Sequence, residues 1–191
     1  MRIVAGKYRS RILKSLQGLR LRPTSDKLRE TLFNILGSAV EGSVFVDVYA
    51  GTGAVGIEAL SRGAAEVFFI ENHRRVADII RQNLESLGIG DSASILAVDA
   101  VKGLEMLAHR KFGKNLQADF VFLDPPYAQE HEYGGVLEFL DSAQFLAPTG
   151  YVIVEHRKGF SLPGWLEQLE CVRLVEQGDA ALSFLRLARA A

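Results

Sequence analysis

The sequence contains a single cysteine, Cys171, and its four histidines are scattered without the spacing of metal ligands. A disulfide framework is therefore excluded, as is a zinc site built from several thiolates. We expect no bound metal. No stretch of about 18 uncharged apolar residues is present, and residues 1–7 lack the apolar core of a signal peptide. These absences predict a cytoplasmic protein that does not contact a membrane.

Net charge is also low, but it is unevenly distributed. The 191 residues have a formal net charge of −1, yet residues 1–29 carry nine Lys or Arg and one acid, Asp26. This segment contributes +8, which leaves the remaining 162 residues at −9. Basic side chains interleaved with Tyr8 and apolar residues are typical of a surface that contacts nucleic-acid phosphates. A solvated terminal segment is the alternative.

Proline is scarce, but two of the five prolines are consecutive, in Asp124-Pro125-Pro126-Tyr127. The apolar run 120–123 before them predicts a strand, which must end there because prolines donate no backbone hydrogen bond. The loop would present a carboxylate, carbonyl oxygens and an aromatic ring at a strand's carboxyl end, where α/β sheets bind ligands. Such acceptors suit an amine, and Tyr127 offers a stacking face. Taken alone, these four residues are equally compatible with a plain turn.

Short apolar runs alternate with amphipathic segments from residue 44 onward. The runs predict strands over 44–48, 67–70, 93–98, 119–123 and 151–155. The segments between them predict helices over 54–62, 74–87, 101–109 and 133–143. This alternation is typical of a parallel sheet covered by helices on both faces.

Both ends of the chain depart from this rhythm. Residues 169–176 and 180–189 flank a turn signal, Gln177-Gly178-Asp179, and predict an antiparallel hairpin that completes a seven-stranded α/β sheet. At the other end, residues 2–6 and 11–14 predict a small basic hairpin. Residues 23–26 predict the start of a helix, and the apolar stripe of this helix ends at Gly37. We therefore divide the chain into an N-terminal extension, residues 1–24, and a domain, residues 25–191.

The ends of the first three strands carry residues typical of a nucleoside site. The first strand leads into residues 47–56, in which three glycines match G-x-G-x-x-G. Glu71 ends the second strand and could accept hydrogen bonds from ribose hydroxyls, while Asp99 follows the third and suits a purine amine. The charge of Asp47 would repel a pyrophosphate but attract a sulfonium or amino group. We therefore favour S-adenosylmethionine over a dinucleotide.

These motifs together resemble Rossmann-like class I methyltransferases that act on amino nitrogens with S-adenosylmethionine. The stretch from Arg22 to Leu36, RPTSDKLRETLFNIL, is more specific. It follows the basic Gly6–Arg11 segment and closely resembles the RsmD-type family, which methylates a guanine N2 of small-subunit (16S) ribosomal RNA. Two positions depart from the family pattern: Ser10 stands where glycine is common, and Tyr49 replaces a more usual phenylalanine.

The resemblance implies a role for each matching position. The candidate cofactor-binding residues are Asp47, Tyr49, Gly51, Gly53, Glu71, Asn72, Asp99 and Ala100. The residues expected to hold the target base are Asp124, Pro125, Pro126 and Tyr127. The candidate RNA contacts are Lys7, Arg9, Arg11, Arg22 and Arg29. We expect the substrate to be ribosomal RNA, within an assembled or assembling subunit, and the enzyme to be a monomer.

Three other functions are compatible with parts of this pattern. A DNA or RNA adenine-N6 methyltransferase would use the same amine-holding loop, although no separate DNA-reading domain is visible in 191 residues. A non-catalytic RNA-binding module could retain the fold, and a nicotinamide oxidoreductase could use the glycine motif. Turnover of the methyl donor, the methylated nucleoside and NAD binding would distinguish them.

Overall fold

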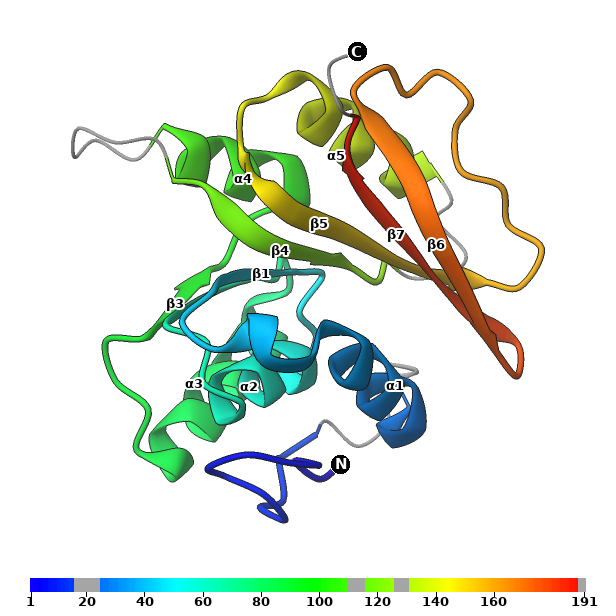
Figure 1. The fold of residues 1–191 in the computed structure, drawn as a ribbon. Coiled ribbons are helices and arrows are strands. Elements are labelled where there is room, and N and C mark those ends of the chain that lie inside the picture. Colours follow the sequence, from blue (N-terminus) through cyan, green and yellow to red (C-terminus); the bar gives the residue numbers. More distant parts are fainter. Residues whose placement is uncertain (16–24, 110–115, 126–130, 189–191) are drawn as a thin grey trace. The chain divides into compact units, whose positions relative to one another are not determined.

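The computed structural model describes residues 1–15, 25–109, 116–125 and 131–188 (Figure 1). The chain forms two compact units, Met1–Asp99 and Ala100–Ala191. Among the described residues, no helix has both the length and the apolar composition needed to cross a membrane.

Three parallel strands form the sheet of the first unit. They are β1 (Val44–Val48), β2 (Glu66–Ile70) and β3 (Ala93–Leu96), in the order β3-β2-β1. The last four residues of both β1 and β2 are buried, as expected for strands covered on two faces. All three strands run in the same direction, so their carboxyl ends lie at one edge.

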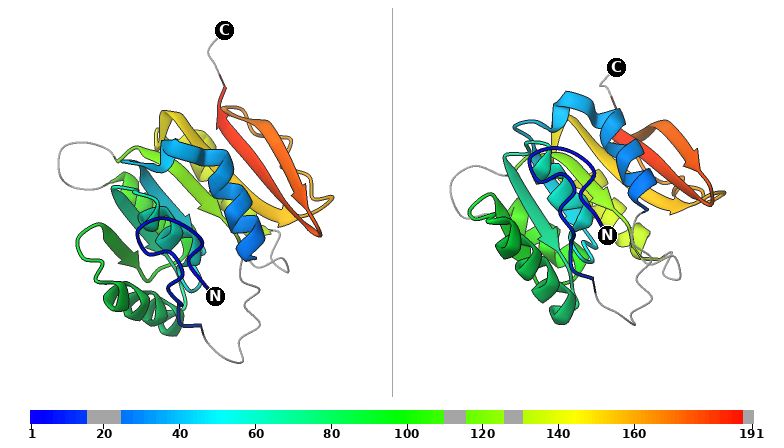
Figure 2. Two further views of the ribbon diagram at one scale, coloured as in Figure 1. Left: turned by 60° about the horizontal axis from the view of Figure 1, so that its bottom comes forward. Right: turned by 90° about the horizontal axis from the view of Figure 1, so that it is seen from below.

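The helices of the first unit are α1 (Asp26–Leu36), α2 (Ala54–Ser61) and α3 (Arg74–Leu87), with a 3₁₀ turn, η1 (Gly37–Val40), after α1. Ser25 caps α1, because its hydroxyl accepts the backbone N–H of Leu28 at 3.1 Å. In Figures 1 and 2, α2 and α3 lie on the same side of the three strands, and the N-terminal segment runs against these helices.

The second unit has four strands: β4 (Ala118–Leu123), β5 (Leu146–Arg157), β6 (Leu169–Gln177) and β7 (Ala180–Leu187). β5 pairs in parallel with β4 and antiparallel with β7, and β7 pairs antiparallel with β6. The predicted C-terminal hairpin is confirmed, with its turn at Gly178.

Two helices complete the second unit, α4 (Ala100–Ala108) and α5 (His131–Ser142). Asp141, near the end of α5, accepts the backbone N–H groups of Glu167, Gln168 and Leu169 at 2.9, 2.9 and 2.7 Å. Burial opposes its charge, but these three donors hold the pKa of Asp141 below its ordinary value. Asp141 thereby ties α5 to the loop that enters β6.

The predicted fold class is confirmed: the described residues form an α/β protein with mostly parallel strands and a C-terminal antiparallel hairpin. β5 is longer than predicted, because residues 146–150 also extend along β4 through an irregular register. β3 is shorter and ends at Leu96. The predicted boundary at residue 24 lies outside the described residues.

Candidate functional site

A tight turn joins β1 to α2 and carries the glycine motif. Tyr49 has a φ of 65°, in the left-handed region that side chains rarely adopt, and Gly51 and Gly53 have φ values of 54° and 80°. The turn is hydrogen-bonded to the end of β2, because the N–H of Ala50 donates to the carbonyl of Ile70 at 3.0 Å. Strained backbone of this kind is kept where the surrounding structure holds it, and it concentrates at binding sites.

The carboxylate of Glu71 holds this turn from the end of β2. Its Oε2 accepts the N–H of Gly51 at 3.0 Å, and its Oε1 accepts the N–H of His73 at 2.8 Å. Burial raises the pKa of Glu71 above its ordinary value, while both N–H bonds work in the opposite direction. Each carboxylate oxygen has a second lone pair, so Glu71 can also accept hydrogen bonds from a diol.

The side chain of Asp47 is part of the interior. Its Oδ2 accepts the N–H of Gly56 at 2.8 Å, and Gly56 is itself required, because a Cβ there would lie 2.3 Å from the ring of Phe69. Burial, with a smaller contribution from the charge of Glu71, raises the pKa of Asp47 to about 8, although the Gly56 N–H opposes this. Burial therefore favours the protonated form of Asp47, which weakens the expectation that its charge attracts a sulfonium.

The other predicted cofactor residues differ in exposure. Asn72 and Asp99 are exposed, and Asp99 directly precedes α4, whose first residue, Ala100, is buried. Gly51 is half-buried, and among the described residues the carbonyl oxygen of Tyr49, at 4.0 Å, is the one atom found within 4 Å of a Cβ built on it. The turn thus offers an uncovered backbone beside the Glu71 carboxylate, which fits a ribose-bearing ligand.

The loop that was predicted to hold an amine begins in the second unit, where β4 ends at Leu123, two residues before Pro125. Asp124 is half-buried and Pro125 is buried. Pro126 and Tyr127 lie outside the described residues. Among the described residues, no group of three or more His, Cys, Asp or Glu side chains could hold a metal ion.

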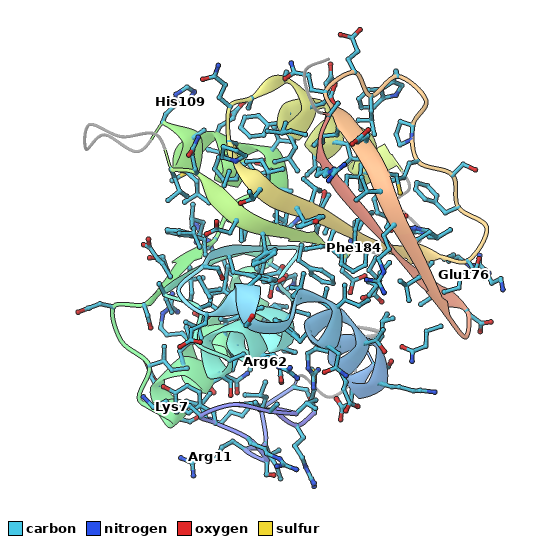
Figure 3. All side chains as sticks on the ribbon, in the orientation of Figure 1. Lys7, Arg11, Arg62, His109, Glu176 and Phe184 are labelled. Atoms are coloured by element: carbon cyan, nitrogen blue, oxygen red, sulfur yellow. The ribbon has the colours of Figure 1, made fainter. Side chains whose placement is uncertain are left out.

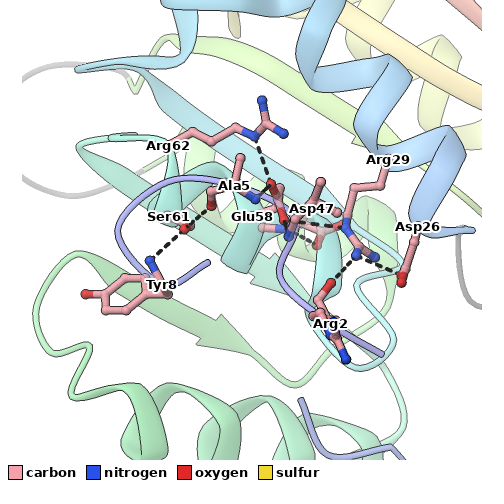
Figure 4. A network of polar contacts seen from close by, with 11 residues as sticks. Arg2, Ala5, Tyr8, Asp26, Arg29, Asp47, Glu58, Ser61 and Arg62 are labelled. Atoms are coloured by element: carbon pink, nitrogen blue, oxygen red, sulfur yellow. Dashed lines mark hydrogen bonds and ion pairs between the residues drawn. The ribbon is translucent and has the colours of Figure 1, made fainter. Parts of the chain in front are cut away.

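The N-terminal segment, residues 1–15, is a docked arm with the form of a short hairpin. Its two halves pair antiparallel through a bridge between Arg2 and Ile12, and the N–H groups of Ile3 and Leu13 donate to the carbonyls of Arg11 and Met1, each at 3.0 Å. The fully buried carboxylate of Glu58 on α2 accepts the N–H groups of Val4 and Ala5 at 2.7 and 3.0 Å (Figure 4). Its charge is balanced by Arg62, whose Nε lies 2.8 Å from Oε1. The arm is thus bound through its backbone.

Ser61 at the end of α2 supplies the second half of this docking site. Its carbonyl accepts the N–H of Lys7 at 2.7 Å, and its hydroxyl accepts the N–H of Tyr8 at 2.9 Å while donating to the carbonyl of Ala5 at 2.5 Å. Gly6 approaches so closely that a Cβ there would lie 1.8 Å from the Ser61 carbonyl oxygen. No other residue type fits at this position.

Ser10 shows what the departure from the family pattern means structurally. Its φ is 68°, so a serine occupies a left-handed conformation in which glycine is favoured by about 1–2 kcal/mol. Its N–H nevertheless donates to the carbonyl of Ile3 at 2.9 Å. In this chain a residue with a Cβ therefore occupies a backbone conformation that favours glycine.

The structure separates the predicted RNA contacts into two groups. Lys7, Arg9 and Arg11 are exposed on the arm, and Figure 3 shows Lys7 and Arg11 directed into solvent. Arg22 lies outside the described residues. The prediction for Arg29 is wrong, because this side chain is 0% exposed and binds within the protein.

The guanidinium of Arg29 has three partners on neighbouring segments. Its Nη2 donates to Oδ1 of Asp26 at 2.9 Å and to the carbonyl of Arg2 at 2.5 Å, and its Nε lies 3.7 Å from Oε2 of Glu58. The guanidinium of Arg29 thus connects α1, the arm and α2. Because it is buried there, it is not available to a phosphate group of RNA.

Sequence reasoning missed Glu58, Ser61 and Asn83, the residues that bind the arm. A signal for Glu58 was present, because it is the one charged residue in a helix that is otherwise apolar or small. All eight positions of α2 are buried, and a carboxylate in such a helix needs buried partners. The pattern did not indicate that those partners are backbone N–H groups of the arm.

Comparison with known proteins identifies the family. Residues 1–186 match the family model described as conserved hypothetical protein 95. The ribosomal RNA small subunit methyltransferase D of Haemophilus influenzae is 34% identical over 163 residues, which cover 83% of this chain and 79% of the relative. The Escherichia coli K12 protein of the same name is 34% identical over 167 residues, covering 85% and 78%. The chain belongs to the ribosomal RNA small subunit methyltransferase D family.

Solved structures related to this family have the same fold. The Escherichia coli protein yhhF, a proposed methyltransferase, superposes with a TM-score of 0.84 at 30% identity and covers 98% of this chain and 97% of its own. The Haemophilus influenzae protein HI0767, a proposed methylase, gives a TM-score of 0.79 at 29% identity, covering 99% of both. The predicted Rossmann-like methyltransferase fold is confirmed.

Proposed function

We propose that this chain transfers a methyl group from S-adenosylmethionine to the exocyclic N2 of a guanine in small-subunit ribosomal RNA. The observation that carries the proposal is the 34% identity to ribosomal RNA small subunit methyltransferase D over more than four fifths of the chain. The glycine turn, held by Glu71, provides groups that suit a nucleoside cofactor. The start of the loop at Asp124 and Pro125 provides acceptors that suit an amine.

The cofactor would be held by the first unit. The uncovered backbone at Gly51 and the fixed carboxylate of Glu71 fit the ribose part of the ligand, and Asp99 would accept a hydrogen bond from the adenine amine. Tyr49, Gly53 and Asn72 remain proposed contacts in this unit, and Ala100, which directly follows Asp99 and begins the second unit, is a further proposed contact. When bound, S-adenosylmethionine supplies an electrophilic sulfonium methyl group. The protonated Asp47 would support the turn through Gly56 rather than attract that charge.

The target amine would be held by Asp124 and Pro125. A guanine amino group is a poor nucleophile because its lone pair is delocalised into the ring. The Asp124 carboxylate and the Pro125 carbonyl can accept its two N–H bonds, which leaves the lone pair directed at the methyl donor. As the nitrogen attacks, it becomes tetrahedral and positive, so these acceptors bind the transition state more strongly than the ground state. S-adenosylhomocysteine would leave, and the methylated nitrogen would then release one proton to give the neutral product. Tyr127 is the proposed stacking partner of the displaced base.

The arm would supply the phosphate contacts. Lys7, Arg9 and Arg11 are exposed on a segment whose backbone is fixed by Glu58 and Ser61, so their charges are presented from a defined position. Such contacts bring affinity that falls steeply as the salt concentration rises. We propose that the enzyme acts as a monomer on an assembled or assembling small subunit.

The deciding experiment incubates the protein with labelled S-adenosylmethionine and undermodified small subunits, and in parallel with naked small-subunit RNA, and then digests both to nucleosides. N2-methylguanosine supports the proposal, and the more active of the two samples identifies the substrate form. N6-methyladenosine would favour an adenine methyltransferase. RNA binding without incorporation of label would favour a binding module.

A further inference from the structure

The side chain of Asn83 on α3 joins the arm to the glycine turn. Its Oδ1 accepts the N–H of Lys14 at 2.8 Å, and its Nδ2 donates to the carbonyls of Lys14 at 3.2 Å and Thr52 at 3.1 Å. Asn83 is 1% exposed; its bond to Thr52 is buried, and its two bonds to Lys14 are partly buried. Thr52 lies between the first two glycines of the motif, and Lys14 lies near the end of the arm's described residues.

An amide is the side-chain group that this position requires. It accepts one backbone N–H and donates to two backbone carbonyls, a combination that neither a carboxylate nor a hydroxyl can provide. The side chain is therefore specified by two backbone segments at once. A residue needed merely to fill space inside α3 would be apolar, as Ile80 one turn earlier is.

The turn also packs directly on α3 beside this amide. A Cβ built on Gly53 would lie 3.1 Å from Cγ2 of Ile80, so Ile80 and Asn83, three residues apart on one helix face, both contact the turn. The arm has a second contact with α3 at the surface, where Nζ of Lys14 donates to Oε1 of Gln82 at 3.0 Å. That bond does not reach the turn and therefore provides a matched control.

We propose that Asn83 is a positioning residue through which RNA bound on the arm strengthens cofactor binding at the glycine turn. RNA contacts on the exposed side chains of the arm stabilise its docked position, which holds Lys14 against Asn83 and keeps the amide directed at Thr52. A turn that is already ordered loses less conformational entropy when it binds a ligand. The coupling is reciprocal, so the cofactor strengthens RNA binding by the same factor. This inference rests on the proposed function, because it requires that both ligands bind.

The test measures the dissociation constant of S-adenosylhomocysteine, which cannot transfer a methyl group, with and without saturating small-subunit RNA transcribed in vitro. For the wild type we expect the constant to fall on the order of 5-fold or more with RNA. Asn83→Asp keeps the acceptor for Lys14 but loses both donors. The ratio of its dissociation constants without and with RNA should therefore be close to one. Gln82→Ala should keep the wild-type ratio. The ratio is taken within each variant, so a general loss of stability does not move it.

A pair of arm variants tests the same bond from the other side. Lys14→Pro removes the N–H that donates to Asn83, whereas Lys14→Ala removes the charge and keeps the N–H. Lys14→Pro should therefore abolish the effect of RNA on S-adenosylhomocysteine binding, and Lys14→Ala should retain it. This pair decides the matter should Asn83→Asp fail to fold.

The outcomes separate this inference from the proposed function. If the wild type binds both ligands with a ratio of one, or if Asn83→Asp and Lys14→Pro keep the wild-type ratio, the coupling role of Asn83 is overturned and the proposed function stands. If the wild type binds neither S-adenosylhomocysteine nor RNA, the proposed function itself fails.

Discussion

The backbone N–H of Gly51 donates a hydrogen bond to Oε2 of Glu71 at 3.0 Å. The carboxylate at the end of β2 therefore determines the shape of the turn that follows β1 before any ligand arrives. A ligand that uses the remaining lone pairs of Glu71 meets a carboxylate already held by two N–H donors, which reduces the cost of ordering it on binding.

Glu71→Gln should weaken cofactor binding by roughly 10-fold or more, because hydrogen bonds to a charged group contribute about 1.5–3 kcal/mol. Glutamine has one carbonyl oxygen, so either Gly51 or His73 would face an NH₂ group in place of an acceptor. Calorimetry with S-adenosylhomocysteine measures the change. Glu85→Gln, at an exposed position on α3, serves as the control. Equal affinities in the two variants would contradict the role of Glu71.

Asp47→Asn should change how stability depends on pH. The pKa of Asp47 is raised to about 8 from an ordinary value of 3.8, so between these values the folded state binds the proton that the unfolded state has lost. Stability from this group is therefore fully present below about pH 4 and is lost as pH rises through about 8. Asparagine cannot ionise yet can still accept the Gly56 N–H.

Urea unfolding at pH 5, 6, 7 and 8 measures this difference. The wild type should lose more stability than Asp47→Asn across the range, while Glu71, whose pKa is also raised, contributes a slope of the same sign to both proteins. Parallel curves for the two proteins would show that Asp47 is charged in the folded state.

Asp124→Ala should nearly abolish methyl transfer while leaving S-adenosylhomocysteine affinity within about 2-fold of the wild type, a change of roughly 0.4 kcal/mol. The reason is that Asp124 is proposed to bind the amine and its developing charge, an interaction made in the transition state. Single-turnover incorporation of label measures the first effect and calorimetry the second. Normal single-turnover rates would exclude the amine-holding role.

Glu58→Ala should destabilise the protein by about 3–5 kcal/mol, because it leaves the buried guanidinium of Arg29 without its interior carboxylate and two arm N–H groups without acceptors. Arg81→Ala disrupts an exposed ion pair with Asp78 and should cost less than about 1 kcal/mol. Urea unfolding compares the two, and limited proteolysis should cleave residues 1–15 faster in the Glu58 variant. Equal losses in both would mean that the arm is held by other contacts.

Replacing Arg9 and Arg11 with alanine should weaken RNA binding and reduce the slope of log affinity against log salt by about 0.7–0.9 for each phosphate that is no longer neutralised. Both side chains are exposed on the arm, so folding should be unaffected. Filter binding at several salt concentrations gives the slope. Arg173→Ala, an exposed arginine on β6, is the control for charge alone. An unchanged slope in the double variant would rule out phosphate binding by these two arginines.

Much of the fold was predictable because its signals are local. The alternation of apolar runs and amphipathic segments predicted β1 and α3 with their observed bounds, and the glycines that end α1 and α3 lie where the chain leaves each helix. The two prolines after Leu123 end β4 as expected. In each case the residues that decide the structure are neighbours in the sequence.

Predictions that depended on distant partners failed more often. Arg29 belongs to a basic segment by composition, yet it lies in the interior, where Glu58 on α2 and the carbonyl of Arg2 on the arm bind it. Asp47 was expected to act through its charge, yet burial keeps it mostly protonated. The spacing of residues in the sequence predicts neither the polar partners of a side chain nor its burial, because both depend on which segments pack together.

The sequence by itself determined the fold class, the glycine turn, the strand end at Asp124 and the excess of positive charge in residues 1–29, since these follow from backbone preferences, periodicity and composition. The tertiary structure alone decided which positive charges face solvent and how the arm is bound. Glu58, Ser61 and Asn83 bind backbone groups of a segment more than 50 residues away, and backbone N–H and carbonyl groups are the same in every residue. Contacts to them carry no signature in the sequence of the arm, except where Gly6 must lack a Cβ.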